Sequence, residues 1–153
     1  MLHIIRTDAT NSDFIQLVSL LDKELAVRDG EDHAFYAQYN QVDAIRHAVV
    51  AYLNDSPVGC GAFKPYSPGM AEVKRMFVQP AVRGQGIASQ VLRALEVWAR
   101  ELNYNELILE TGQAQPEAIG LYIKSGYVVI PNYGQYEQVE NSVCFKKVMD
   151  ASV

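Results

Sequence analysis

Apolar residues near the start of the chain follow a helical spacing. After a short apolar run at Leu2–Arg6, which we expect to form a strand, hydrophobic side chains recur at about the 3.6-residue period of a helix. Asn11 or Ser12 can cap this helix, and Gly30 is a stop signal beyond it. A second, short helix is expected over Asp32–Tyr39. The apolar face of the first helix comprises Phe14, Leu17, Val18, Leu21 and Leu25.

The middle of the chain alternates apolar, β-branched runs with turn residues. Ile45–Leu53, Val58–Tyr66 and Ala71–Val78 are predicted strands. The segments between them, Asn54–Pro57 and Ser67–Gly69, have typical turn composition. Short turns between successive strands predict antiparallel pairing.

The second half alternates helix and strand. A long helix with one apolar face is expected over Ile87–Leu102, and a second helix runs from Pro116 to about Ser125 with Gly126 as its stop. Strands are expected at Glu106–Thr111, Tyr127–Ile130 and Val143–Val148. A strand–helix–strand order implies a right-handed parallel crossover. The chain is therefore predicted to have an α/β (α+β mixed) fold, with a mixed, largely antiparallel sheet flanked by helices.

Length and charge narrow the function classes. The 153 residues suit one domain, residues 1–153. With 13 Lys and Arg against 18 Asp and Glu, the net charge is −5. Polyanions need clustered cations, so we expect neither nucleic acid nor an anionic membrane as the main partner. The N-terminus lacks the apolar run of a secretory signal and no stretch is long enough to span a bilayer, so a cytoplasmic location is expected.

The cysteines and histidines indicate no redox or metal chemistry. Cys60 and Cys144 lie in apolar, strand-like segments, where we expect reduced, buried thiols. The three histidines show no metal-ligand spacing, so no metal site is expected.

The loop that leads into the long helix carries the strongest chemical signal. Gly84 and Gly86 let the backbone approach a ligand closely, and the first N–H groups of the helix lack intrahelical partners. With the helix dipole and Arg83 at the rim, the loop predicts a bound phosphate or pyrophosphate. The P-loop pattern is absent, and Ser89 takes the place of the third glycine of a dinucleotide motif, which argues against ATP and NAD. By itself, Gly-x-Gly before a helix is equally compatible with an ordinary strand–helix loop.

Three segments in order resemble the GNAT superfamily of acyl-CoA-dependent N-acetyltransferases. Arg83–Ala88 resembles its Arg/Gln-x-x-Gly-x-Gly/Ala signature. Glu72–Pro80 resembles the family's central strand, and Ala118–Tyr127 its A-x-x-L-Y-x-x-x-G-F/Y helix and strand. The likeness covers about residues 45–130, whereas residues 1–44 fit only as the variable acceptor-side helices. It implies the GNAT fold, with a splayed central strand and a βαβ crossover.

The resemblance implies acetyl-CoA as cosubstrate. Its pyrophosphate is expected on the N–H groups of the glycine loop, and its pantetheine arm alongside the central strand near Met76 and Val78. Gln115 stands where many relatives have Asn. Glu72 lies roughly 20 Å before Val78 along the strand, so an arm running back from the loop places the thioester near mid-strand. The implied cosubstrate-binding residues are Met76, Phe77, Val78, Arg83, Gly84, Gln85, Gly86, Ile87, Ala88, Ser89, Gln115 and Tyr122.

Acyl transfer to an amine requires a base, a polarised carbonyl and an acid. An alkyl amine has a pKa of about 10, so a carboxylate must remove its proton. The resemblance implies Glu72 in this role, with Glu110 as the alternative, and Tyr122 as the acid for the departing thiolate. A backbone N–H near Met76–Val78 can polarise the carbonyl. The competing interpretations are an ion-paired strand glutamate for Glu72 and a core aromatic for Tyr122.

Two further segments are candidates for the acceptor side. Strand alternation places Lys74 on the face of Glu72 and Arg75 opposite, unless a bulge interrupts the strand. One of the two could meet an acidic acceptor, with surface charge pairing as the alternative. The polar, aromatic segment Asn132–Tyr136 could border the acceptor pocket.

Three functions follow from these observations. The first is an N-acetyltransferase that acts on the primary amine of a small metabolite, by direct attack in a ternary complex. The second is a protein lysine or N-terminal acetyltransferase, and the third a non-catalytic acyl-CoA sensor. A homodimer is possible for each, and no motif identifies the acceptor.

Overall fold

The computed structural model describes residues 1–29 and 45–149. The predicted helix over Asp32–Tyr39 lies outside the described residues. The helices are α1 (Ser12–Asp29), α3 (Ile87–Glu101) and α4 (Pro116–Lys124), with short 3-10 helices at Pro80–Val82 and Gly134–Tyr136. The strands are β1 (Leu2–Thr7), β2 (His47–Leu53), β3 (Ser56–Ser67), β4 (Met70–Val78), β5 (Glu106–Gly112), β6 (Val128–Ile130) and β7 (Ser142–Val148). Within the described residues, each predicted element is present, with bounds within two residues of those expected.

Local chemistry explains where the first elements begin and turn. The Asn11 side-chain oxygen accepts a hydrogen bond from the Phe14 N–H at 2.9 Å, which caps α1 as predicted. Between β2 and β3, Asn54 and Asp55 have φ values of 51° and 69°. This left-handed pair makes a two-residue hairpin turn whose twist matches that of the strands.

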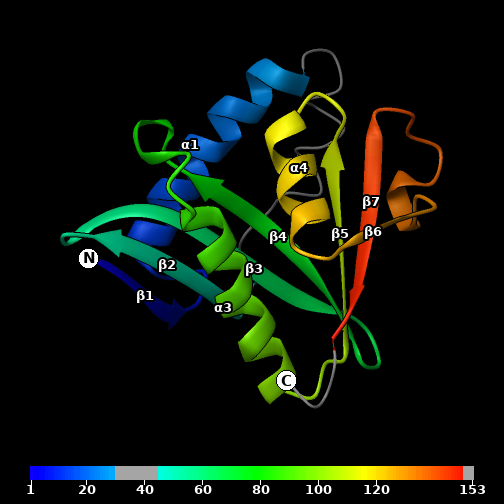
Figure 1. The fold of residues 1–153 in the computed structure, drawn as a ribbon, viewed down its shortest axis with the longest axis horizontal. Helices are drawn as coiled ribbons and strands as arrows, with labels where there is room; N and C mark the ends of the chain where they lie inside the picture. The colour runs from blue at the N-terminus through cyan, green and yellow to red at the C-terminus, as the bar shows by residue number, and fades with distance from the viewer. Residues whose placement is uncertain (30–44, 150–153) are drawn as a thin grey trace.

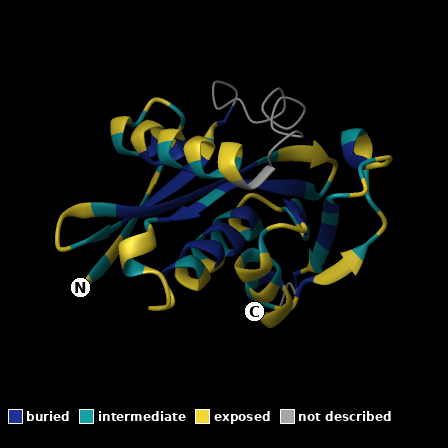
Figure 2. Cartoon of the chain, turned by 90° about the horizontal axis from the view of Figure 1, so that it is seen from above, coloured by how far each residue is buried: buried dark blue, intermediate teal, exposed yellow. Residues whose placement is uncertain are grey.

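The sheet has helices on both faces (Figures 1 and 2). In β2, Ala48 and Val50 belong to the core under α1, whereas Val49 and Ala51 belong to the core under α3. The apolar run in this strand is unbroken because neither face meets water. The buried side chains of α1 in the first core are Phe14, Leu17, Val18 and Leu21, and those of α3 in the second are Ile87, Val91, Leu92, Leu95 and Ala99.

The predicted parallel crossover is confirmed, and its two strands separate soon after they meet. β4 and β5, connected through α3, pair in parallel only at Met70–Glu106, Ala71–Leu107 and Glu72–Ile108. Beyond these pairs the strands diverge, as Figure 1 shows. From residue 73 to 78, the β5-facing edge of β4 therefore has no strand partner among the described residues. This is the splayed central strand that the resemblance implied.

The strand order departs from the order of the chain at one edge. The sheet runs β1-β2-β3-β4-β5-β7-β6, so the last strand lies between β5 and β6. β7 is antiparallel to both neighbours, and its Phe145 stands opposite Leu109 on one side and Val129 on the other. β5 and β6, which α4 connects, are consequently not adjacent.

A bulge interrupts β4 at Arg75. Cys60 pairs with Phe77 and Ala62 pairs with Lys74, so the residue between them on β3 faces two residues of β4. Arg75 itself has a φ of 62°, a left-handed conformation that is rare for a residue with a side chain.

The bulge changes which side chains share a face. Val73 and Met76 pack in the core under α3, whereas Arg75 reaches Asp22 of α1 on the opposite face. Simple alternation, which puts Arg75 on the α3 side, is therefore wrong at this point. Lys74 and Arg75 are consecutive in sequence yet both lie on the α1 side, together with Glu72.

Gly61 stands opposite the bulge, and a side chain there has no room. A Cβ at this position would lie 2.7 Å from the Met76 sulfur and 2.9 Å from a Leu95 methyl carbon. We expect Gly61→Val to lower the free energy of unfolding by about 1–3 kcal/mol through overpacking. Urea unfolding measures this.

Gly120→Ala in α4 is the matched control. Its Cβ would meet nothing within 4 Å, so we expect unchanged stability or a gain of up to about 1 kcal/mol. Equal losses in both variants would contradict the tight packing at the bulge.

Candidate active site

A cavity of about 590 Å³ opens where β4 and β5 diverge. It is lined by β4, by the loop before α3, by the end of β5, and by residues of α1 and α4. The structure brings together at this cavity all the residues expected to bind the cosubstrate or act in catalysis, except Gln85. Those that line it are Glu72, Met76, Phe77, Val78, Arg83, Gly84, Gly86, Ile87, Ala88, Ser89, Gln115 and Tyr122.

The glycine loop has the conformation of an anion site. Gly84 and Gly86 have φ values of 84° and 80°, and a Cβ on either would meet nothing within 4 Å. Backbone conformation, rather than lack of space, is therefore what favours glycine at both positions. Gly86 is the N-cap of α3 and provides no side-chain cap, so the N–H groups of the first turn are open to an acceptor from outside the helix.

Arg83 lies at the rim of the cavity, but its charge is already paired. Two guanidinium nitrogens lie 2.9 Å from the carboxylate oxygens of Glu24 on α1. Its Nε donates to the Val78 carbonyl at 2.8 Å, and its backbone N–H donates to the Pro80 carbonyl at 3.3 Å. The cation expected at the rim is therefore present, but as one partner of an ion pair. An anion would meet main-chain N–H groups instead.

Tyr122 both packs in the core and lines the cavity. It is 5% exposed, and its ring lies 5.8 Å from that of Tyr127 and 5.7 Å from that of Phe145. Burial, and secondarily the charge of Glu110, raise the pKa of Tyr122. Its hydroxyl therefore stays protonated at neutral pH, as a proton donor must.

A buried polar network holds the end of α4 that follows Tyr122. Glu96 of α3 is 2% exposed and accepts hydrogen bonds from the Tyr127 hydroxyl at 3.0 Å and from Lys147 at 3.1 Å. Lys147 also donates to the Ser125 carbonyl at 3.0 Å. This network was not predicted from the sequence, although a glutamate within the apolar face of α3 was a visible signal.

Two carboxylates face the cavity from neighbouring strands. Glu72 is 3% exposed, accepts a hydrogen bond from Tyr133 at 2.7 Å, and lies 4.0 Å from the Lys74 ammonium. Glu110 accepts a hydrogen bond from Ser142 at 2.6 Å. Burial lowers the pKa of Lys74, and the nearby charge of Glu72 partly opposes this effect.

The aromatic segment Asn132–Tyr136 lies at the carboxylate end of the cavity. Tyr136 lines the cavity, and Tyr133 bonds to Glu72. The Tyr133 ring packs 5.3 Å from Tyr66 and 5.8 Å from Tyr136. Tyr66, Ser142 and the α1 acids were not predicted from the sequence, since only tertiary contacts connect these residues to the site.

Within the described part of the chain, no group of three or more His, Cys, Asp or Glu residues could hold a metal ion. The same residues include no helix that is long and apolar enough to cross a membrane.

Cys60 and Cys144 are both buried, and burial raises the pKa of Cys60 to about 12 and that of Cys144 to about 11. Neither thiol is activated as a nucleophile.

Comparison with known proteins identifies the family. Residues 14–127 match the model of the Acetyltransferase (GNAT) family. The chain belongs to the GNAT family. This GNAT chain is 35% identical over 136 residues to IAA acetyltransferase of Azospirillum brasilense, with 87% of this chain and 88% of that protein covered. It is an acetyl-CoA-dependent N-acetyltransferase, as the resemblance implied.

Solved structures confirm the GNAT fold. A Klebsiella pneumoniae protein assigned as an acyl-CoA N-acyltransferase superposes with a TM-score of 0.82 at 28% identity, over 98% of this chain and 99% of that one. The PaiA N-acetyltransferase of Thermoplasma acidophilum, solved with coenzyme A, has a TM-score of 0.72 at 14% identity, over 97% and 99% of the two chains.

The buried tyrosines predict that the folded protein loses stability at alkaline pH. Burial raises the pKa of Tyr122, Tyr127, Tyr133 and Tyr136. The folded state keeps these protons while the unfolded state loses them above about pH 10, so stability falls as pH rises beyond that value. Ultraviolet titration should show these phenols ionising only as the protein unfolds. Reversible ionisation of all nine tyrosines near pH 10 in the folded protein would contradict the burial.

Proposed function

We propose that this GNAT enzyme acetylates the primary amine of a small molecule, by direct attack in a ternary complex. The observation that carries the proposal is one cavity with open main-chain N–H groups at one end and two carboxylates at the other. Acetyl-CoA and an amine can thus meet between them. The similarity to a protein named IAA acetyltransferase supports a small-molecule acceptor.

The cosubstrate fits the glycine loop and the free edge of β4. In this proposal, N–H groups from Gly84 to Ser89 bind the pyrophosphate, since no side chain caps the helix there. The pantetheine arm pairs with β4 between Met76 and Val78, where β5 has diverged. Gln115, the N-cap of α4, provides a side-chain amide. Gln85 is not among the cavity-lining residues, and in this proposal it contributes only its backbone N–H.

In this proposal, the bulge in β4 provides the backbone N–H that polarises the thioester carbonyl. An extra residue in a strand leaves main-chain groups without ladder partners. The bulge lies at Arg75–Met76, next to the stretch where a polarising N–H is expected. A donor fixed by the sheet costs little reorganisation when charge develops on the oxygen.

Glu72 is the proposed base. Its carboxylate is buried in the cavity, and the Tyr133 hydroxyl holds one oxygen at 2.7 Å. The other oxygen, 4.0 Å from Lys74, is the one that takes up the proton of the ammonium, directly or through water. Glu110, already bonded to Ser142, is the alternative base. Tyr122 then donates its proton to the thiolate of coenzyme A.

Kinetics of single variants test these roles. We expect Tyr122→Phe and Glu72→Gln each to lower kcat by about 10²–10⁴-fold, because each removes a proton transfer. Both should retain the wild-type Kd for acetyl-CoA by calorimetry. Glu110→Gln is the matched carboxylate comparison and should have the smaller effect. A Tyr122→Phe enzyme with wild-type kcat at every pH would exclude tyrosine as the acid.

Binding measurements test the anion site separately from the chemistry. Gly86→Ala disfavours the left-handed conformation that opens the N-terminus of α3, so we expect about tenfold weaker coenzyme A binding, or about 1.4 kcal/mol. Gly126→Ala is the matched control because Gly126 also has a positive φ of 93° and is not among the cavity residues. Equal weakening in both variants would point to general destabilisation and against the proposed phosphate site.

A further inference from the structure

We propose that the acceptor carries a carboxylate next to its reacting amine, as an α-amino acid does, and that Arg75 with Lys74 binds this carboxylate. The proposal rests on the acetyltransferase function above and specifies its substrate class.

The bulge in β4 creates the pair of cations. Without it, Arg75 would point into the core under α3; with it, Lys74 and Arg75 share the α1 side of β4 with Glu72. All three line the cavity. Alternate residues along a strand are about 7 Å apart. A small zwitterion can therefore place its ammonium at Glu72 and its carboxylate at the two cations.

Arg75 has an unused hydrogen-bond donor in a buried position. Its side chain is 1% exposed, and it uses one terminal nitrogen to bond to Asp22 at 2.6 Å. Its Nε is buried and has no hydrogen-bond partner among the described residues. A guanidinium binds a carboxylate through two parallel N–H bonds. A buried donor without a partner costs stability. A carboxylate ligand at this position would provide the hydrogen-bond acceptor that the Nε–H of Arg75 lacks.

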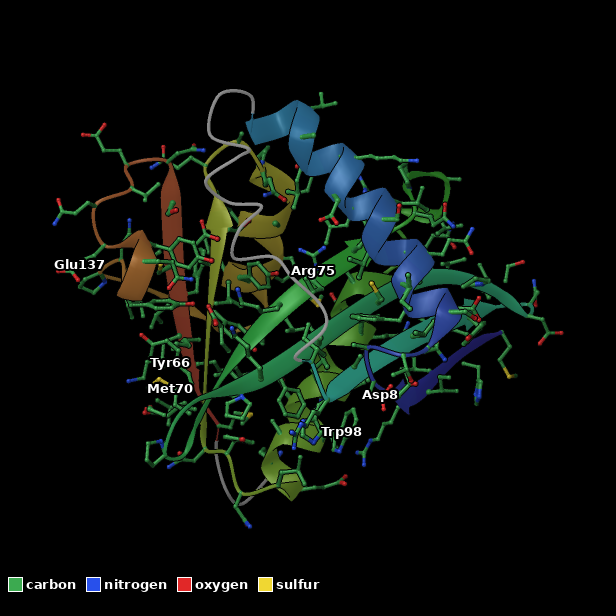
Figure 3. The ribbon with its side chains drawn as sticks, turned by 180° about the vertical axis from the view of Figure 1, so that it is seen from behind. Asp8, Tyr66, Met70, Arg75, Trp98 and Glu137 are labelled. Carbon is green, nitrogen blue, oxygen red and sulfur yellow. The ribbon has the colours of Figure 1, made fainter. Side chains whose placement is uncertain are left out.

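Backbone strain at Arg75 supports a functional role. A left-handed φ of 62° is unfavourable for arginine, and such strain concentrates at functional sites. Figure 3, in which Arg75 is labelled, shows it on β4 beside α1. The competing role is to attach α1 to β4 through Asp22. Asp22 is 50% exposed, however, and ion pairs with a solvated partner contribute little.

The charges around the acceptor end favour a zwitterion over a simple amine. The cations Lys74 and Arg75 line the cavity together with the carboxylates Glu72 and Glu110, and Glu72 lies 4.0 Å from Lys74. Asp22 is the ion-pair partner of Arg75 on α1. An amine alone interacts only with the carboxylates. An α-amino acid interacts with both signs at once, which orients the amine toward the base.

Matched acceptors test the inference. The wild-type enzyme is assayed at saturating acetyl-CoA with α-amino acids and with the corresponding α-amides, which keep the amine but lack the carboxylate. We expect kcat/KM to favour the acids by at least about tenfold, equivalent to about 1.4 kcal/mol. Arg75→Met should remove this preference by raising KM for the acids more than KM for the amides. Lys23→Met, on the exposed surface of α1, should keep the preference.

Two further variants distinguish recognition from fold maintenance. Arg75→Lys keeps the charge without the planar fork, and we expect it to fold and to recover part of the preference. Asp22→Asn removes the tie to α1, and we expect it to keep the preference. If Asp22→Asn and Arg75→Met have the same effect, Arg75 serves only to hold α1.

Product binding provides a readout without turnover. In the presence of coenzyme A, N-acetyl amino acids should bind the wild-type enzyme more tightly than their amides, and this difference should disappear in Arg75→Met. Amides acetylated as well as acids would overturn the inference and leave the proposed function standing. Acetylation of no amine, with coenzyme A bound, would overturn the proposed function, and equal binding of the two products would then also overturn the inference.

Discussion

The separation of β4 from β5 is the feature on which the rest of this site depends. The two strands are parallel neighbours for only three residue pairs and then diverge. A sheet edge left open in the interior would be costly, because buried N–H and C=O groups need partners. An extended ligand that pairs with this edge removes that cost. The same divergence gives the cavity its volume and its access to both α3 and α4.

Two ion pairs connect α1 to this opened sheet. Arg75 reaches Asp22 and Arg83 reaches Glu24, and both acids lie near the same end of α1. The first pair is set by the bulge in β4, the second by the loop that follows β4. These pairs hold α1 beside the cavity, and the apolar face of α1 packs against the sheet through Phe14 and Leu17.

Neighbouring side chains compensate the charges within the cavity. Glu72 is held by Tyr133 and Lys74, and Glu110 by Ser142. A buried charge without such partners would be expensive. As a result, both positive and negative side chains lie at the carboxylate end of the cavity. This arrangement suits a ligand that carries an ammonium and a carboxylate. In the proposed function, the residues that pair with one another in the folded protein are also the ones that select the acceptor.

Sequence alone was sufficient for the elements of the described residues, the glycine loop, the family and the cavity residues of β4, the glycine loop and α4, because each depends on local spacing or on a contiguous motif. Only the tertiary structure determined the features that depend on contacts between residues far apart in the sequence. The Tyr133–Glu72 bond joins residues 61 positions apart, and the Arg83–Glu24 bond joins residues 59 apart. β7 entered between β5 and β6 because strand order follows sheet pairing, which no local pattern encodes. Arg75 changed faces because a bulge depends on the room that Gly61 leaves on the neighbouring strand.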